Sequence, residues 1–300
     1  MRVLLTLPHI FAPREGSVYS SQTEAKRPLK TEALRNATLG NHSRHRRRHW
    51  IHASLGRGKQ IVTRALNGEL GVELTIQIYT DPNANLLKNI PANEAIQIHP
   101  ISLEDPSQLP MYASRRAIEQ AESFDLIGYL EDDLLIEDPE FFHKISFLVE
   151  ATGGDYAFLP HRCERIPDQG EVILSGDPDD GEERREELFW NTGEVLHFNW
   201  PLGERRFYRA INPHSGCYFL TRDQGVRLRR FWEEREWKAP FQLSGPLEQA
   251  GSGILLPQLK LMKPVPEHHR FLMIHHHDQL WVRHGFESDD DRPYDSNKEI

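Results

Sequence analysis

The sequence predicts an α/β protein in which helices flank a mostly parallel central sheet. Residues 3–7 and 124–130 form nearly continuous apolar runs, which are typical of strands covered on both faces. Strand-like and helix-like segments alternate along the chain, a rhythm that indicates crossovers and parallel pairing. Some strands end abruptly in charged side chains, and in open α/β sheets ligands bind at the carboxyl ends of strands.

The first half of the chain supplies most of the expected strands. Residues 3–7 stop at Pro8-His9, and residues 72–79 alternate with period two. Residues 95–99 form a shorter strand of the same kind. A basic helix is expected over residues 31–55, and a second helix opens at Pro110 and leads into the apolar strand 124–130.

The second half continues the same rhythm up to about residue 285. Helices are expected at 137–150, at 222–237 and from Ser244, and strands at 155–160, 217–221 and 271–274. Residues 167–187 are acidic and glycine-rich and are expected to form a surface loop or a lid. The polar residues 286–300 are expected to be a disordered tail.

Composition excludes several classes of protein. A net charge of −9 argues against general nucleic-acid binding. Two cysteines are too few for a disulfide framework. The first apolar run is too short for a signal peptide, and no stretch reaches the length of a membrane span. We therefore expect a soluble, cytoplasmic protein.

Three carboxylates, Glu131, Asp132 and Asp133, directly follow the central apolar strand. They repel one another unless a cation lies between them, and a hard divalent ion such as Mg²⁺ or Mn²⁺ carrying a phosphorylated substrate is the natural partner. In extended backbone Glu131 and Asp133 share one side, and Asp132 faces the other, where it can bond a ribose or backbone donors. The alternative is an acidic turn before the helix that Asp138-Pro139 begins.

Taken with the late segments of the chain, this motif resembles the GT-A class of nucleotide-sugar-dependent glycosyltransferases. The resemblance covers residues 1–285 and implies one GT-A-like (Rossmann-like) catalytic domain, with a nucleotide-binding half at about 1–150 and an acceptor-binding half at 151–285. Its DxD motif corresponds to residues 131–133, with Glu in place of the first Asp, which leaves open whether Glu131 or Asp132 meets the ribose. The resemblance also implies matches at Ser215-Gly216-Cys217-Tyr218 (sugar or acceptor strand), Asp133 (metal ligand), Glu248 (catalytic acid residue) and one of His275, His276 and His277 (metal ligand).

The implied chemistry is the transfer of a sugar from a nucleoside-diphosphate sugar, a UDP-sugar first, to a hydroxyl of a glycan, lipid or protein. A metal ion neutralises charge on the diphosphate leaving group, and Arg115 or Arg116 can add a fixed positive charge. An inverting enzyme needs a carboxylate base, for which Glu248 is the first candidate and Glu267 the second. Glu248 can equally be an ordinary first-turn helix acid.

The three consecutive histidines divide by strand alternation. His275 and His277 share one side and His276 takes the other, and we assign metal binding to the 275/277 side. Solvent exposure of all three, or adventitious binding of a transition metal, is the alternative.

Two other functions compete with sugar transfer. A metal-dependent hydrolase would need several ligands at short spacing, whereas the other histidines of the first half are scattered. A nucleic-acid or protein-interaction module would rest on the basic residues 44–49, which can also be a solvated helix face. The acidic net charge speaks against that module.

Overall fold

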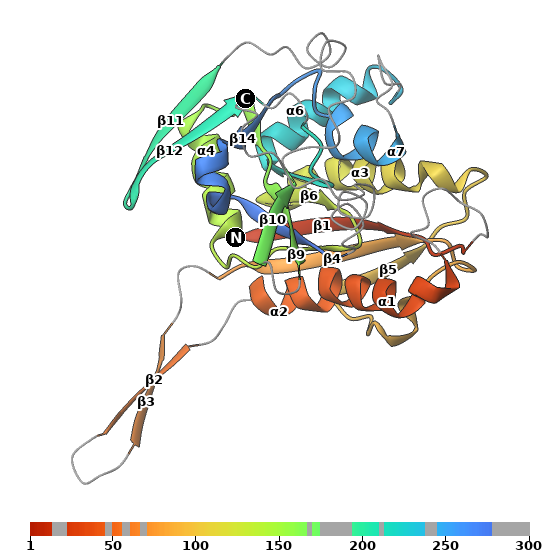
Figure 1. The fold of residues 1–300 in the computed structure, drawn as a ribbon, viewed down its shortest axis with the longest axis horizontal. Helices are drawn as coiled ribbons and strands as arrows, with labels where there is room; N and C mark the ends of the chain where they lie inside the picture. The colour runs from red at the N-terminus through yellow and green to blue at the C-terminus, as the bar shows by residue number, and fades with distance from the viewer. Residues whose placement is uncertain are drawn as a thin grey trace, which may run out of the picture.

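A computed structural model of the protein describes residues 1–13, 23–45, 50–55, 61–66, 71–166, 170–174, 194–209, 213–237 and 245–277 (Figure 1). The statements below concern those residues. Of the predicted loop 167–187, residues 167–169 and 175–187 lie outside them, as do Arg46 to His49, Ser244 and the tail 286–300.

The central sheet has five strands in the order β13-β6-β1-β4-β5, and four of them are parallel. The edge strand β13 runs antiparallel to β6. This confirms the predicted α/β class with a mostly parallel sheet. The strands are β1 (Arg2–His9), β4 (Glu73–Thr80), β5 (Ile96–Pro100), β6 (Leu126–Leu130) and β13 (Cys217–Thr221).

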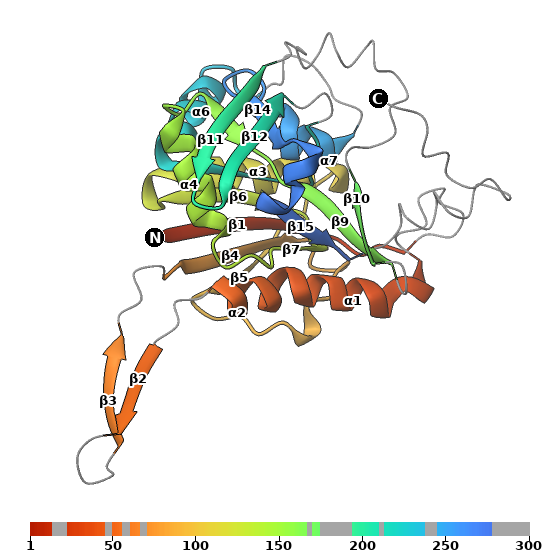
Figure 2. The same ribbon diagram turned by 60° about the vertical axis from the view of Figure 1, so that its left-hand side comes forward.

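Helices cover both faces of this sheet, as Figures 1 and 2 show. Successive β1 residues alternate between two hydrophobic cores, so that Leu5 packs in one and Leu4 in the other. Helices α1 (Arg27–Arg35), α2 (Asn41–His45) and α4 (Phe141–Ala151) lie on the side of Leu5. Helices α3 (Leu109–Glu119) and α6 (Arg222–Glu233) lie on the side of Leu4.

The structure also contains two smaller mixed sheets of four strands each (Figure 2). The first has the order β10-β9-β15-β7 and the second the order β11-β12-β14-β8. The first sheet brings the acidic turn after β6 next to the late histidines. Its strands are β7 (Leu134–Leu135), β9 (His161–Ile166), β10 (Gly170–Leu174) and β15 (Met273–His276); those of the second are β8 (Tyr156–Phe158), β11 (Val195–Trp200), β12 (Gly203–Arg209) and β14 (Lys260–Pro264).

Short helical turns join these elements, and no described helix has the length and apolar character needed to cross a membrane. The turns are α7 (Pro246–Glu248), the 3-10 turns η2 (Glu24–Lys26), η4 (Leu87–Asn89), η5 (Pro106–Gln108), η6 (Ala121–Ser123) and η8 (Pro266–Phe271), and the π-helical turns η3 (Asn36–Gly40) and η7 (Gln249–Gly253).

Three local predictions were wrong. The helix expected over 31–55 ends at His45, and Trp50–Leu55 forms strand β2, paired antiparallel with β3 (Ile61–Leu66). Aromatic and β-branched residues favour such pairing, and a Gly-rich stretch between the two segments is a hairpin signal. Gly170–Leu174 is a strand rather than a loop, because β9 offers it a pairing edge. Phe271 ends η8 and precedes the last strand.

Candidate functional site

The three carboxylates follow β6 at the carboxyl end of the parallel sheet. The backbone N–H of Glu131 still donates to the Gly216 carbonyl at 2.9 Å, so the chain turns only after that residue. Glu131 and Asp133 are buried, whereas Asp132 is partly exposed. The turn sends Asp132 toward the end of β1 and Asp133 toward β15.

Asp132 binds His9, the last residue of β1. The backbone N–H of Leu86 donates to His9 Nε2 at 2.9 Å, so Nε2 acts as the acceptor and Nδ1 carries the proton. That proton is donated to Asp132 Oδ2 at 2.5 Å. A backbone group thus sets the tautomer of His9, and His9 in turn orients the exposed carboxylate.

Two cationic side chains lie close to the same carboxylate oxygen of Asp133. Lys30 Nζ of α1 lies 3.2 Å from Oδ2, and His276 Nε2 lies 3.5 Å from the same atom. Burial opposes ionisation of Asp133, but the charges of Lys30 and His276 outweigh it and hold the pKa well below its usual range. The other oxygen, Oδ1, is buried and has no hydrogen-bond partner in the described part of the chain.

A second carboxylate, that of Glu164, accepts a hydrogen bond from the other ring nitrogen of His276. Its Nδ1 donates to Glu164 Oε1 at 2.6 Å, and Glu164 is fully buried. Burial lowers the pKa of His276, but Asp133 and Glu164 raise it more, to about 9. A buried carboxylate on one ring nitrogen, with the other nitrogen facing a second ligand atom, is the usual support of a metal-binding histidine.

The Glu131 carboxylate packs closely against Gly216. Gly216 has φ +66°, and a Cβ there would lie 2.7 Å from Glu131 Oε2. His214 Nε2 lies 3.7 Å from the other carboxylate oxygen. Burial and the neighbouring charge of Asp133 raise the pKa of Glu131 to about 8, which leaves Asp133 as the ionised member of the pair.

Buried basic groups surround these acids. Arg162 of β9 is buried, and its charge lowers the pKa of Glu131 after burial and Asp133 have raised it. Lys263 of β14 is also buried and donates to the His214 carbonyl at 2.9 Å. Such fixed positive charges suit an anionic ligand at this end of the sheet.

Within β15 the late histidines divide as strand alternation requires, with His275 and His276 on opposite faces. His276 faces Asp133, whereas His275 Nε2 lies 2.9 Å from Glu137 on the opposite face. His277 follows β15, donates its backbone N–H to the Asp133 carbonyl at 3.0 Å, and has a buried Nε2 with no hydrogen-bond partner among the described residues. The structure brings His276 and His277 to Asp133 and keeps His275 away from it.

Arg115 and Arg116 do not join the acids. Both pair with Glu119 on their own helix, at 2.7 and 2.5 Å. The Arg115 guanidinium also lies 4.8 Å from the centre of the Trp237 ring. The two arginines lie away from the acids because they are on the exposed face of α3. The opposite face, with Ala113, Ala117 and Ile118, is buried.

Glu248 lies in α7 and is half-buried. Its charge adds to the raised pKa of Glu131 and of Tyr129, so the carboxylate is within electrostatic reach of the acids. Tyr129 OH is buried and has no hydrogen-bond partner within the described ranges. The three groups therefore belong to the same end of the sheet.

Sequence reasoning missed Lys30, Glu164 and Arg162. The pair His161-Arg162 after a strand was a usable signal, because carboxyl ends of parallel strands converge. No local pattern singles out Lys30 or Glu164, which reach the site from 103 and 112 residues away in sequence.

The residues fit a hard divalent cation. Asp133 offers an unused buried oxygen, and His276 Nε2 lies next to the same carboxylate with Glu164 supporting its other nitrogen. Metal binding would release the proton from His276, since a ligating imidazole is neutral.

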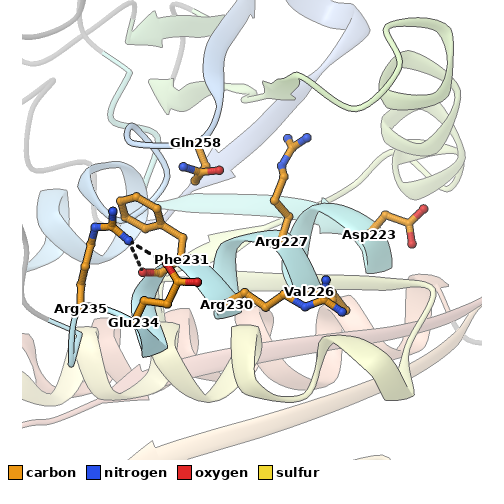
Figure 3. A pocket seen from close by; sticks show the side chains of 8 residues that line it. All are labelled: Asp223, Val226, Arg227, Arg230, Phe231, Glu234, Arg235 and Gln258. Atoms are coloured by element: carbon orange, nitrogen blue, oxygen red, sulfur yellow. Dashed lines mark hydrogen bonds and ion pairs between the residues drawn. The ribbon is translucent and has the colours of Figure 1, made fainter.

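A surface hollow of about 690 Å³ lies elsewhere, along α6. Figure 3 shows its lining, in which Arg235 lies beside Phe231 and Arg227 and Arg230 lie further along the same helix. The Arg235 guanidinium lies 3.9 Å from the centre of the Phe231 ring. None of the three acids lines this hollow, so its size gives no support to the site at residues 131–133.

The basic segment is partly buried. His45 is buried, its Nε2 lies 3.0 Å from the Ile136 carbonyl, and burial lowers its pKa. Arg44 Nη2 lies 3.7 Å from Glu137. Two members of the basic cluster 44–49 thus contact the rest of the fold, which weakens the interaction-module alternative.

Comparisons with known proteins give a likeness of fold. No protein-family model matches the sequence, and no curated protein matches it. The structure is similar to the GT-A glycosyltransferase GalNAc-T7, solved with UDP, GalNAc and Mn²⁺, at 12% identity and a TM-score of 0.45, over 92% of this chain and 43% of that one. It is also similar to residues 1–349 of TarS from S. aureus, at 11% identity and a TM-score of 0.44, over 88% of this chain and 58% of that one. The chain spans about half the length of these solved chains. At these values the likeness is one of backbone arrangement.

Proposed function

We propose that the protein is a glycosyltransferase that moves a sugar from a nucleoside-diphosphate sugar to an acceptor hydroxyl with the help of Mn²⁺ or Mg²⁺. A UDP-sugar is the first donor to test. The observation that carries the proposal is the pair Asp133 and His276, backed by Glu164, at the carboxyl end of a parallel sheet.

Asp133 and His276 would hold the cation, and His277 lies next to them. When bound, the cation would neutralise the negative charge that develops on the diphosphate leaving group. Lys30 and Arg162 add fixed positive charge around the same place.

The exposed carboxylate Asp132 is available to a ligand hydroxyl. His9 and the Leu86 backbone hold it in place before any ligand arrives, which lowers the entropic cost of binding. This supports contact with the ribose through Asp132 rather than through the buried Glu131.

Glu248 would take the proton from the acceptor hydroxyl. Its half-burial and its electrostatic coupling to Glu131 and Tyr129 support a position beside the donor. Arg115 and Arg116 have no role in this proposal, because both are paired with Glu119.

Thermal unfolding with Mn²⁺ alone, UDP alone and both together tests the proposal. A ligand selective for the native state raises the melting temperature, and we expect the UDP shift to require Mn²⁺. Asp133→Ala should abolish that shift. Asp125→Ala is the matched control, since Asp125 precedes the same strand at its opposite end and is exposed; it should keep the shift.

A screen of nucleotide sugars, with release of the nucleoside diphosphate as readout, then identifies the donor. Absence of any metal-dependent shift with UDP, GDP or dTDP, together with no release from their sugars, would refute the proposal. Release that is no faster with an added acceptor hydroxyl than with water alone would instead favour the hydrolase alternative.

A further inference from the structure

The sheet β10-β9-β15-β7 has a second face that the proposed function does not use. In its register His275 lies opposite Cys163 of β9 and Leu135 of β7. Strand alternation therefore puts His275 and Cys163 on one face, and His276 and Glu164 on the other. The second face carries its own group of side chains that can bind a metal.

Three donor atoms on this face, from Cys163, His275 and Glu171, all lie within 4.8 Å of one another. Cys163 is fully buried and the His275 side chain is 5% exposed, whereas Glu171 of β10 is 35% exposed. Glu137, just after β7, brings a fourth donor, with Oε2 2.9 Å from His275 Nε2. Sulfur, nitrogen and carboxylate oxygen form the ligand set of zinc.

The two polar neighbours of His275 Nε2 require different protonation states of this nitrogen. Arg165 Nη2 lies 3.2 Å away and can only donate, so it requires a lone pair on Nε2. Glu137 Oε2 at 2.9 Å can only accept when ionised, so it requires a proton on Nε2. One nitrogen cannot satisfy both at once. Its partner atom Nδ1 is buried and finds no hydrogen bond in the described chain.

A metal ion removes this conflict, because it accepts lone pairs from nitrogen and from carboxylate oxygen together. Ligand atoms around tetrahedral zinc lie about 3.3 Å apart for bonds of about 2 Å. The distances from His275 Nε2 to Glu137 Oε2 and to Glu171 Oε1, 2.9 and 3.9 Å, bracket that value. Small side-chain shifts would bring both oxygens into range.

We propose that Cys163, His275, Glu171 and Glu137 form a binding site for a zinc-class transition metal ion, separate from the site at Asp133. The Cys163 thiol gives its proton to solvent on binding, and His275 binds as neutral imidazole. The Arg165 side chain is 54% exposed and moves out toward solvent as the ion takes over the two glutamates. One bound ion would thus have ligands from β10, β9, β15 and the segment after β7.

This inference is independent of sugar transfer. The site at Asp133 offers carboxylate oxygen and imidazole nitrogen and no sulfur, whereas the thiolate of Cys163 selects softer ions. The two sites also lie on opposite faces of the same sheet. Asp133→Ala should therefore leave the second site unaffected.

The test uses the full chain titrated with Co²⁺ and then with Zn²⁺. We expect one equivalent of Co²⁺ with thiolate-to-metal charge-transfer absorption, displaced by Zn²⁺ with a Kd of about 1 µM or tighter. Native mass spectrometry gives the stoichiometry. Zn²⁺ should also raise the melting temperature, since it binds the folded state.

Four variants make the assignment specific. Cys163→Ala should abolish the charge-transfer band and the Zn²⁺ shift, whereas Cys217→Ala, which removes the other buried free cysteine, should keep both. Glu171→Gln should weaken Zn²⁺ binding at least tenfold. Arg165→Gln should strengthen it, because it removes the competing cation.

The opposite results would overturn the proposal. Wild-type protein without a charge-transfer band, or with the same band in Cys163→Ala, would show that no such site exists. Weaker Zn²⁺ binding in Arg165→Gln would indicate that the cluster is an ion-pair network that needs its guanidinium. Failure of the Mn²⁺-dependent UDP shift would leave these outcomes unchanged.

Discussion

His276 and Glu164 form a buried hydrogen bond of 2.6 Å between β15 and β9, and this bond aims the other histidine nitrogen at Asp133. A histidine ring that donates a hydrogen bond to a buried carboxylate cannot rotate freely, so the direction of Nε2 is already set in the absence of a cation. This preorganisation would let the turn after β6 and strand β15 act together in the proposed cation site.

The His276–Glu164 bond predicts a graded loss of metal binding. His276→Ala should remove a ligand and abolish Mn²⁺-dependent UDP binding. Glu164→Gln keeps the shape but weakens the support, and we expect affinity to fall by about 10- to 100-fold. Calorimetric titration of UDP in the presence of Mn²⁺ measures both. His275→Ala is the control, and an equal loss there would contradict the assignment of His276.

Lys30 competes for the carboxylate that would bind the cation. Lys30→Met leaves Asp133 with less positive charge around it, so Mn²⁺ affinity should rise by roughly fivefold, or about 1 kcal/mol. The exposed Lys88→Met removes the same charge elsewhere and should leave Mn²⁺ affinity at the wild-type value. Mn²⁺ titration followed by electron paramagnetic resonance compares the two. A lower Mn²⁺ affinity in Lys30→Met would contradict the competition between Lys30 and the cation for Asp133.

Gly216 is required by space as well as by backbone conformation. Gly216→Ala adds a Cβ at 2.7 Å from Glu131 at φ +66°, and we expect a loss of about 3 kcal/mol in unfolding free energy. Gly153 has the same φ, but a Cβ there meets nothing within 4 Å. Gly153→Ala should therefore cost only about 1 kcal/mol. Urea unfolding distinguishes the two, and equal losses would exclude the clash with Glu131.

Glu248 is expected to act in the chemical step. Glu248→Gln should lower kcat by about 100-fold or more, because the amide cannot take a proton, and should leave the KM for the nucleotide sugar nearly unchanged. Glu267→Gln is the matched control: Glu267 is exposed and pairs with Arg206 at 3.9 Å. A wild-type kcat in Glu248→Gln would assign Glu248 to the helix start alone.

Burial of His45 predicts a loss of stability in acid. Burial lowers the pKa of His45 below 6.5, so the native state holds the ring neutral while the unfolded chain takes up a proton below that pH. The stability that neutral His45 provides is complete above pH 6.5 and is lost progressively as pH falls toward the lowered pKa.

Urea unfolding at pH 7 and pH 5 checks this. His45→Gln keeps an amide donor for the Ile136 carbonyl but does not titrate, and its stability should fall less between the two pH values than that of the wild type. The exposed His197→Gln should behave as the wild type does. An unchanged pH dependence in His45→Gln would contradict the prediction.

Local patterns in the sequence predict the central strands and the position of the acids that follow them. Nearly continuous apolar runs identify β1 and β6 because strands buried on both faces need apolar side chains throughout. The turn of Glu131, Asp132 and Asp133 follows from the end of that run. Strand alternation also required His275 and His276 to face opposite ways.

Only the tertiary structure decided which histidine meets Asp133. That choice depends on the register of β15 against β9 and β7, which no local pattern encodes. Lys30 lies 103 residues before Asp133, and Glu164 lies 112 residues before His276. Arg115 and Arg116 lie away from the site because they are on the exposed face of α3. Local patterns record which face of an element is apolar, whereas the meeting of side chains from distant elements depends on how those faces pack together.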